Sequence, residues 1–393
     1  MAVGIRGLPG PPAEWPDFPH HSLLFQYFKD YVAHFGLRDK ITFNTSVDHA
    51  ERGDDGLWTV TLSTGETRAY DALIVCNGHH WDPNTPPDYP GQFDGTLMHS
   101  HEYNDPPFDP IDMRGKNVVV VGMGNSGLDI ASELSQRFLA KKLTVSARRG
   151  VWVLPKYLGG KAGDKMSAPA WMPRSLSLAL SRRFLRKNIG TMEGYGLPKP
   201  DHQPFEAHPS ASGEFLGKAG SGRHLVQARH HRAGGQAGAL RRRERRRRRR
   251  DHLRHRLPHQ LPVLHGPEPV ARQQKPIPTV QADDEARHRQ PLLHGLAQPM
   301  PTLVNFAEQQ SKLVAAYLAG KYQPPSPSEM RSVLAADEKY YLGPPYYESP
   351  RHTIQCEFDP YVRNLKKEIA DGGKRARLAG NALPVPARAL QNA

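Results

Sequence analysis

Three glycines in the stretch VVVVGMGNSGLDIASELS, residues 118–135, have the spacing that binds a dinucleotide. The four valines predict a buried strand, and the residues that follow have the periodicity of an amphipathic helix. In such a turn the first glycine bends the chain, the second admits a pyrophosphate, and the third allows close helix packing. The helix N-terminus then faces the phosphates. The expected cofactor-binding residues are Gly122, Gly124, Asn125, Ser126 and Gly127.

The next expected strand, residues 142–146, indicates which dinucleotide binds. A site for NAD would end this strand on Asp or Glu, which holds the ribose 2′-hydroxyl. Here the strand ends in Ser146, and Arg148 and Arg149 follow after one alanine. A hydroxyl and a guanidinium group suit a 2′-phosphate, so these three residues favour NADP. A pair of solvated arginines in a surface turn is the alternative that remains open.

Composition limits the class of protein. With 393 residues and 38% hydrophobic content, the chain has room for two domains of ordinary size with cores. No stretch approaches the roughly 18 apolar residues of a membrane span, and the N-terminus has no apolar signal region, so we expect no membrane partner. The two cysteines have no C-x-x-C spacing, which fits a cytoplasmic protein. The adjacent histidines lack further ligands, so we expect no metal.

Most of the net charge of +14 lies in residues 221–294. This segment has 17 Arg and one Lys against six acidic residues, and it includes the run RRRERRRRRR at residues 241–250. It has no Phe, Tyr or Trp. Such a composition cannot bury enough apolar surface to offset the entropy of ordering, so we expect residues 221–294 to be disordered.

Three interpretations of residues 221–294 compete. An Arg-rich arm would bind nucleic acid phosphates, although aromatic stacking residues are missing. A charged linker of this length is uncommon inside a compact enzyme. The third interpretation is translation out of frame, because a GC-rich gene read in a wrong frame yields much Arg, His, Pro, Gly and Ala. We favour the third interpretation, and we therefore do not expect a nucleic acid partner.

A second motif lies upstream of the glycines. Phe93, Gly95, His99 and Tyr103 have the spacing F-x-G-x-x-x-H-x-x-x-Y, which resembles the identifying motif of flavin-containing monooxygenases. The resemblance covers roughly residues 11–220 and 295–370. Baeyer-Villiger relatives typically end this motif with Trp followed by Pro. Here Asn104 follows the final tyrosine, which favours the branch that oxidises heteroatoms.

The resemblance implies an α/β flavoprotein with two Rossmann-like dinucleotide-binding domains, one for FAD and one for NADP. We expect residues 1–110 to be a remnant of the FAD domain, with 295–393 returning to it, and residues 111–220 to form the NADP domain. The printed sequence has only one G-x-G-x-x-G. It therefore lacks the first flavin-binding βαβ unit, and residues 221–294 replace the last strands of the NADP domain. Both domains are expected to be incomplete, and activity weak or absent.

For function, the resemblance implies that NADPH reduces FAD and that the flavin then activates O₂ to oxidise a small nitrogen or sulfur compound, as in N,N-dimethylaniline monooxygenases. His99 would lie near the nicotinamide cofactor. Gln298 would belong to a loop whose following helix points at the flavin. No catalytic residue is assigned, and homo-oligomerisation is left open. The alternatives are a Baeyer-Villiger monooxygenase and a non-enzymatic protein that binds nucleotides or nucleic acid.

Overall fold

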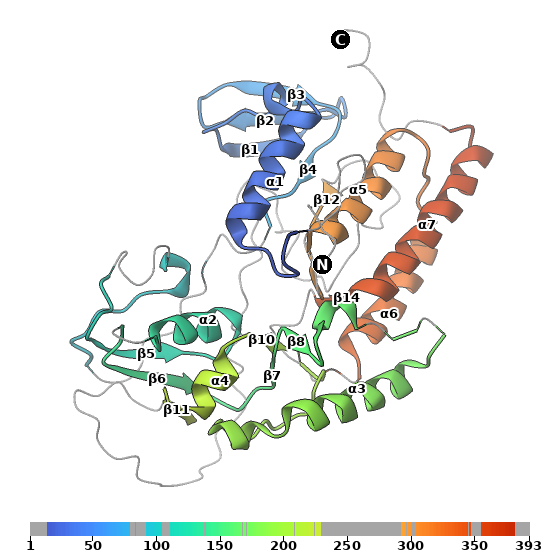
Figure 1. Cartoon of the computed structure of the whole chain (residues 1–393). Coiled ribbons are helices and arrows are strands. Elements are labelled where there is room, and N and C mark those ends of the chain that lie inside the picture. The colour runs from blue at the N-terminus through green and yellow to red at the C-terminus, as the bar shows by residue number, and fades with distance from the viewer. Residues whose placement is uncertain are drawn as a thin grey trace, which may run out of the picture. The chain divides into compact units, whose positions relative to one another are not determined.

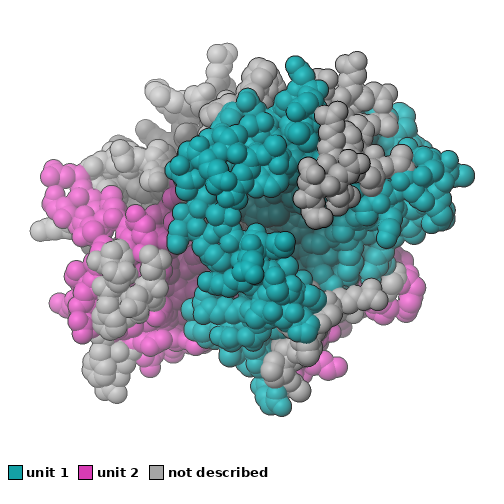
Figure 2. Space-filling view, turned by 90° about the horizontal axis from the view of Figure 1, so that it is seen from above, with its two compact units in different colours: residues 1–82, 258–344, 351–393 teal, residues 83–257, 345–350 magenta. Residues whose placement is uncertain are grey.

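The structure is a computed structural model of the whole chain (Figure 1). It describes residues 14–78, 83, 92–103, 111–136, 139–166, 168–169, 171–207, 209–223, 225–228, 292–295, 297–300, 303–344, 346 and 355–381. The chain forms two compact units, coloured separately in Figure 2. Unit 1 contains residues 1–82, 258–344 and 351–393, and unit 2 contains residues 83–257 and 345–350.

Unit 2 is built on a parallel sheet of three strands in the order β11-β6-β5. Strand β5 (Asn117–Val121) leads through the glycine turn into helix α2 (Asn125–Leu134) and then into β6 (Lys142–Ala147). Strand β11 (Leu225–Ala228) lies on the other side of β6. This strand order is that of one Rossmann half. The strand, turn and helix predicted around the glycines are therefore confirmed.

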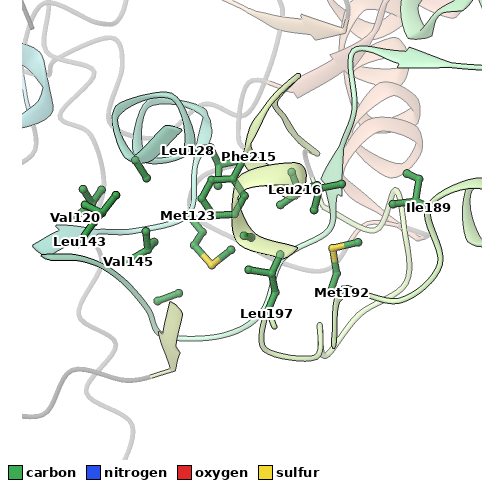
Figure 3. Packing of buried hydrophobic residues seen from close by; sticks show 14 of the residues in the cluster. Val120, Met123, Leu128, Leu143, Val145, Ile189, Met192, Leu197, Phe215 and Leu216 are labelled. Carbon is green, nitrogen blue, oxygen red and sulfur yellow. The ribbon is translucent and has the colours of Figure 1, made fainter. Parts of the chain in front are cut away.

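The core of unit 2 lies beneath helix α2 (Figure 3). Leu128, Ala131 and Leu134 of α2 are fully buried because their spacing places them on one face of the helix. They pack with Val145 of β6 and with Phe215 of the short helix α4 (Phe215–Gly220). This packing fixes α2 on the sheet and so fixes the direction of its N-terminus.

The remaining elements of unit 2 follow β6 in the chain, apart from η2, which precedes β5. Strand β7 pairs with β10 in parallel, and β8 forms a hairpin with β9. Helix α3 is the longest helix of the unit. The bounds are η2 (Ser100–Glu102), β7 (Val153–Leu154), β8 (Tyr157–Leu158), β9 (Lys161–Ala162), η3 (Gly163–Lys165), α3 (Arg174–Ile189), η4 (Met192–Tyr195) and β10 (Ser210–Ala211).

The N-terminal part of unit 1 contains helix α1 (His21–His34), η1 (Arg38–Lys40) and an antiparallel sheet. The sheet has the order β1-β2-β3, with β1 (Val47–Arg52), β2 (Trp58–Leu62) and β3 (Thr67–Tyr70). Alternate residues of β2 are buried, as expected for a strand with one face on a core. Trp58, Val60 and Leu62 form that core with Ala50 of β1.

The C-terminal part of unit 1 is joined to the N-terminal part by strand pairing. Strand β12 (Leu292–Leu293) pairs in parallel with β4 (Ile74–Val75), and β13 (Gln298–Met300) pairs in parallel with β14 (Gln355–Glu357). Helices α5 (Leu303–Leu318), α6 (Pro327–Leu342) and α7 (Phe358–Leu378) complete this part. Its core contains Phe306 of α5 and Tyr361 of α7, whose rings stack with centroids 4.5 Å apart.

Both ends of the Arg-rich segment 221–294 lie in described elements. Its first residues continue into β11, and its last residues form β12. Residues 229–291, including the arginine run, lie outside the described residues. The expectation of disorder or a wrong reading frame for residues 221–294 therefore stays a prediction. Across the described ranges, none of the helices combines the length and the apolar character that crossing a bilayer requires.

Candidate dinucleotide-binding site

The glycine turn lies at the carboxyl ends of β5 and β6. Val121 pairs with Ser146, and the next residue, Gly122, donates its N–H to the carbonyl oxygen of Ser146 at 2.7 Å. The φ angle of Gly122 is +107°, a conformation that side chains rarely tolerate. The first glycine thus turns the chain sharply where the strand ends, as the sequence predicted.

Gly127 lies where any side chain would clash with the backbone of the preceding turn. A Cβ atom at this position would lie 2.6 Å from the carbonyl oxygen of Gly122. The first turn of α2 therefore approaches the end of β5 more closely than any side chain permits. Gly124 is the N-cap of α2 in an extended conformation, so the free N–H groups of the first turn follow it directly. This arrangement forms a cradle for an anion.

The turn is fastened from a distant part of the chain. Ser210 Oγ donates to the carbonyl oxygen of Met123 at 2.9 Å, and Asn125 Oδ1 accepts from the N–H of Ala211 at 2.9 Å. Ser210 is buried. The side chain of Asn125, predicted to bind cofactor, braces the loop against β10, whereas Ser126 is exposed. Sequence reasoning missed Ser210 because no local pattern links residues so far apart.

The residues predicted to select NADP lie next to this turn. Ser146 is buried within β6, and among the described residues its Oγ has no hydrogen-bond partner. Arg148 and Arg149 follow the last residue of β6 and are exposed. The structure thus brings both guanidinium groups to the strand end at which a 2′-phosphate is recognised in this fold.

Arg149 is restrained by an acidic neighbour. Its Nη1 lies 3.6 Å from Asp201 Oδ2, and Asp201 Oδ1 lies 2.9 Å from His202 Nδ1. The hydrogen bond with His202, together with the positive charge of Arg149, lowers the pKa of Asp201. Asp201 therefore stays ionised at neutral pH and offsets part of the charge of Arg149.

The F-x-G-x-x-x-H-x-x-x-Y motif has a structural role in unit 2. His99 caps η2: its Nδ1 accepts from the N–H of His101, and Glu102 accepts from the N–H of His99, each at 3.0 Å. Tyr103 donates from its hydroxyl to Glu133 Oε2 of α2 at 3.4 Å. Burial, strengthened by the charge of Glu133, raises the pKa of Tyr103. The motif thus ends on a contact with the helix that presents the phosphate cradle.

Gln298 lies in unit 1, in strand β13. Before it, Gly295 has a φ of +73° and donates its N–H to Gln310 Oε1 at 2.9 Å. Gln310 is buried in α5, and its amide donates to the Tyr361 hydroxyl at 3.0 Å. The loop before β13 is therefore fixed by polar side chains. Sequence reasoning missed Gln310 because a single glutamine in a helix carries no motif.

The predicted site residues thus fall into two groups. The glycines, Ser126, Asn125, Ser146, the two arginines and His99 belong to unit 2, and Gln298 belongs to unit 1. The first group fits NADP, because the cradle excludes a Cβ and positive charge lies at the second strand end. The printed sequence has no second G-x-G-x-x-G, so the residues that hold a flavin pyrophosphate remain unassigned.

Comparisons with known proteins show what this chain is similar to. Residues 9–171 match the family model described as flavin-binding monooxygenase-like. Rat flavin-containing monooxygenase 5 is 29% identical over 403 residues, which cover 97% of this chain and 73% of the rat protein. Rat dimethylaniline monooxygenase [N-oxide-forming] 2 is 40% identical over 155 residues, covering 37% of this chain and 28% of that protein.

The fold matches solved monooxygenases. A crystal structure of cyclohexanone monooxygenase bound to ε-caprolactone superposes with a TM-score of 0.57 at 16% identity, covering 92% of this chain and 85% of that one. This likeness confirms the predicted two-domain α/β flavoprotein fold. The family match bears out the predicted monooxygenase class and the predicted cofactors, FAD and NADP. Residues 9–171 therefore match the flavin-binding monooxygenase-like family, and nearly the whole chain is similar to a flavin-containing monooxygenase.

Proposed function

We propose that this chain is an NADPH- and FAD-dependent monooxygenase that oxidises a nitrogen or sulfur atom of a small compound with O₂. The observation that carries the proposal is the glycine turn of unit 2, which excludes a Cβ at Gly127 and leads to two arginines after β6. The free cysteines, exposed Cys76 and buried Cys356, support a cytoplasmic location.

The proposed roles in unit 2 concern binding and orientation. The N–H groups that follow Gly124 receive the pyrophosphate, and the dipole of α2 adds to their attraction. The hydrogen bonds of Ser210 and Asn125 hold the glycine loop in the conformation that receives the pyrophosphate. When bound, the flavin supplies the oxygen chemistry, and the protein positions the two cofactors and excludes water.

Arg148 is the proposed main contact of the 2′-phosphate. Arg149 already faces Asp201, whereas no ion pair of Arg148 is recorded within the described residues. Phosphate binding is more favourable at an exposed guanidinium without an acidic neighbour than at one whose ion pair with a carboxylate must first break. We therefore assign discrimination against NAD chiefly to Arg148.

Oxidation of a heteroatom is favoured over Baeyer-Villiger chemistry by the end of the motif at residues 93–103. The final tyrosine bonds Glu133, and asparagine follows it, where Baeyer-Villiger relatives typically have Trp and Pro. The relative with the higher identity is named as an N-oxide-forming enzyme. The cyclohexanone monooxygenases resemble this chain in fold alone, so they carry no argument about the substrate.

The test is a comparison of products with purified protein supplied with FAD. We expect impaired activity, because the printed sequence has only one G-x-G-x-x-G: weak flavin binding, slow oxidation of NADPH that is still faster than that of NADH, and formation of a sulfoxide from an aryl methyl sulfide. A cyclic ketone is the parallel substrate. A lactone without sulfoxide would replace the proposal with the Baeyer-Villiger reaction. Protein that leaves added FAD free would overturn the proposed activity for this chain.

A further inference from the structure

An acidic side chain reaches the dinucleotide site of unit 2 from a distant part of the chain. At the end of β6 the sequence has Ser146 and then two arginines, where a site for NAD has Asp or Glu. In the structure Asp201 lies beside these arginines, with its Oδ2 3.6 Å from Arg149 Nη1. The proposed function gives Asp201 no direct contact with the cofactor.

The chain on either side of Asp201 is held against the residues that follow β6. Gly150 forms a parallel bridge with Pro200, and a Cβ atom at Gly150 would overlap backbone atoms of the chain just before Pro200. On the other side, Trp152 Nε1 donates to the carbonyl oxygen of His202 at 2.8 Å. Because these contacts flank Asp201, its backbone is fixed beside the strand end.

Helix α3 fastens the continuation of this segment. Arg182 donates from Nε to the carbonyl oxygen of Pro204 at 3.0 Å and from Nη2 to Glu206 Oε1 at 3.2 Å. The other carboxylate oxygen of Glu206 accepts from the N–H of Gln203 at 2.8 Å. Glu206 is therefore already engaged in holding the segment. Of the two acids in residues 198–206, Asp201 is the one paired with an arginine of the cofactor site.

The carboxylate of Asp201 has room for a further hydrogen bond. Its Oδ1 lies 2.9 Å from Nδ1 of His202, whose side chain is only 8% exposed. An ionised carboxylate has about four acceptor positions on its two oxygens, so the contacts with His202 and Arg149 do not fill it. The side chain of Asp201 is 57% exposed. A hydroxyl group of a bound ligand can therefore reach it.

We propose that Asp201 accepts a hydrogen bond from the ribose 2′-hydroxyl of NAD and so opposes Arg148 in the choice between the two dinucleotides. Because it concerns the same dinucleotide site, this role rests on the proposed function. With NAD bound, Asp201 takes the place of the acid that ends the strand in NAD sites. With NADP bound, its charge repels the 2′-phosphate. The chain therefore prefers NADP only moderately and also binds NAD.

The test is calorimetric titration of the full chain with NAD⁺, 2′-deoxy-NAD⁺ and NADP⁺. We expect the native chain to bind NAD⁺ about fivefold more tightly than 2′-deoxy-NAD⁺, a comparison that needs no substitution. In Asp201→Ala this difference should fall below about twofold, and NADP⁺ affinity should rise about threefold because a like charge is removed. Asp201→Asn, which keeps the shape of the side chain, should raise NADP⁺ affinity similarly.

Glu193→Ala is the matched control, because it removes an exposed carboxylate of η4 in the same unit and should change none of these affinities. Equal binding of NAD⁺ and 2′-deoxy-NAD⁺ by the native chain would overturn the role of Asp201. A lower NADP⁺ affinity in both Asp201 variants would also overturn it, because Asp201 would then only position Arg149. Either result leaves the proposed function intact as long as NADP⁺ binds. A native chain that binds neither NADP⁺ nor NAD⁺ would refute both.

Discussion

Each unit contains a glycine turn that follows a strand, and the two turns differ in what fixes the glycine. Between β5 and α2, the backbone of Gly122 has a positive φ and Gly127 leaves no room for a side chain. Between β12 and β13, Gly295 also has a positive φ, but the buried amide of Gln310 accepts a hydrogen bond from its N–H. In the first turn a side chain is excluded by the backbone, and in the second a polar side chain bonds the glycine itself.

This difference explains what each turn is suited to do. The glycines of the first turn let a phosphate approach the free backbone N–H groups of α2, which fits the proposed dinucleotide site of unit 2. In unit 1, Gln310 already occupies the N–H of Gly295, and His294 Nε2 lies 3.0 Å from the carbonyl oxygen of Ala307. The second turn therefore positions β13 and α5 and does not itself offer that N–H to a ligand.

Gly127→Ala should have the largest effect. The new Cβ would overlap the carbonyl oxygen of Gly122, so α2 must move away from β5. We expect unit 2 to lose about 2–4 kcal/mol of unfolding free energy and NADP⁺ binding to fall below detection. Chemical unfolding and calorimetry measure the two effects. Gly217→Ala, where a Cβ meets nothing within 4 Å, is the control and should be nearly neutral.

Gln310→Leu tests whether the turn of unit 1 depends on polar contacts. The substitution leaves the N–H of Gly295 and the hydroxyl of Tyr361 without their partner. We expect a loss of about 2–3 kcal/mol of unfolding free energy in unit 1 and no change in NADP⁺ affinity. Gln309→Leu, at the neighbouring position, should cost much less. Equal effects of the two substitutions would show that the amide of Gln310 does not fix the turn.

Ser210→Ala asks whether the glycine turn also needs a polar clamp. Loss of the hydroxyl removes the hydrogen bond to the carbonyl oxygen of Met123 but leaves the steric fit of Gly127 intact. We expect NADP⁺ affinity to fall about three- to tenfold, with unfolding free energy reduced by about 1 kcal/mol. Ser212→Ala, which removes the hydroxyl that accepts from the N–H of Phe215 at the start of α4, should lower stability without changing affinity. If the Ser210→Ala variant binds NADP⁺ as tightly as the native chain, the glycines alone fix the turn and the polar clamp is not needed.

Asp337→Asn should have the smallest effect. Burial raises the pKa of Asp337 in α6, so the folded state prefers the protonated carboxyl. Stability in unit 1 therefore decreases as the pH rises from below the unfolded pKa through the higher folded pKa. The variant should be more stable than the native chain at pH 7 by less than about 1 kcal/mol, and the gain should vanish near pH 3. A gain that persists at acid pH would exclude this cause.

The sequence predicted the parts of the site that depend on local spacing. The turn at residues 122–127 was predictable because the glycines that it requires for steric reasons lie within one short stretch of sequence. Arg148 and Arg149 were predictable because they follow the next strand. Ser210, Asp201 and Gln310 were not predictable, because each meets its partner only after the chain has folded back from a distant position.

The reading frame of the Arg-rich segment stays a prediction that sequencing of the coding DNA tests directly. The alignment with rat flavin-containing monooxygenase 5 covers 97% of this chain, so it runs through residues 221–294. Inside the segment, near its two ends, strands β11 and β12 pair with β6 and β4. We expect a compensating pair of insertions or deletions near codons 221 and 294. An uninterrupted frame confirmed by resequencing would refute this explanation.

Calorimetric titration of the native chain, Arg148→Ala and Arg149→Ala with NADP⁺ and NAD⁺ tests whether the arginines after β6 select NADP. We expect the native chain to bind NADP⁺ at least about tenfold more tightly than NAD⁺. Arg148→Ala should abolish most of this preference while leaving NAD⁺ affinity unchanged, and Arg149→Ala should have a smaller effect because Asp201 already engages that arginine. Equal affinity of the native chain for the two dinucleotides would show that these arginines do not select NADP.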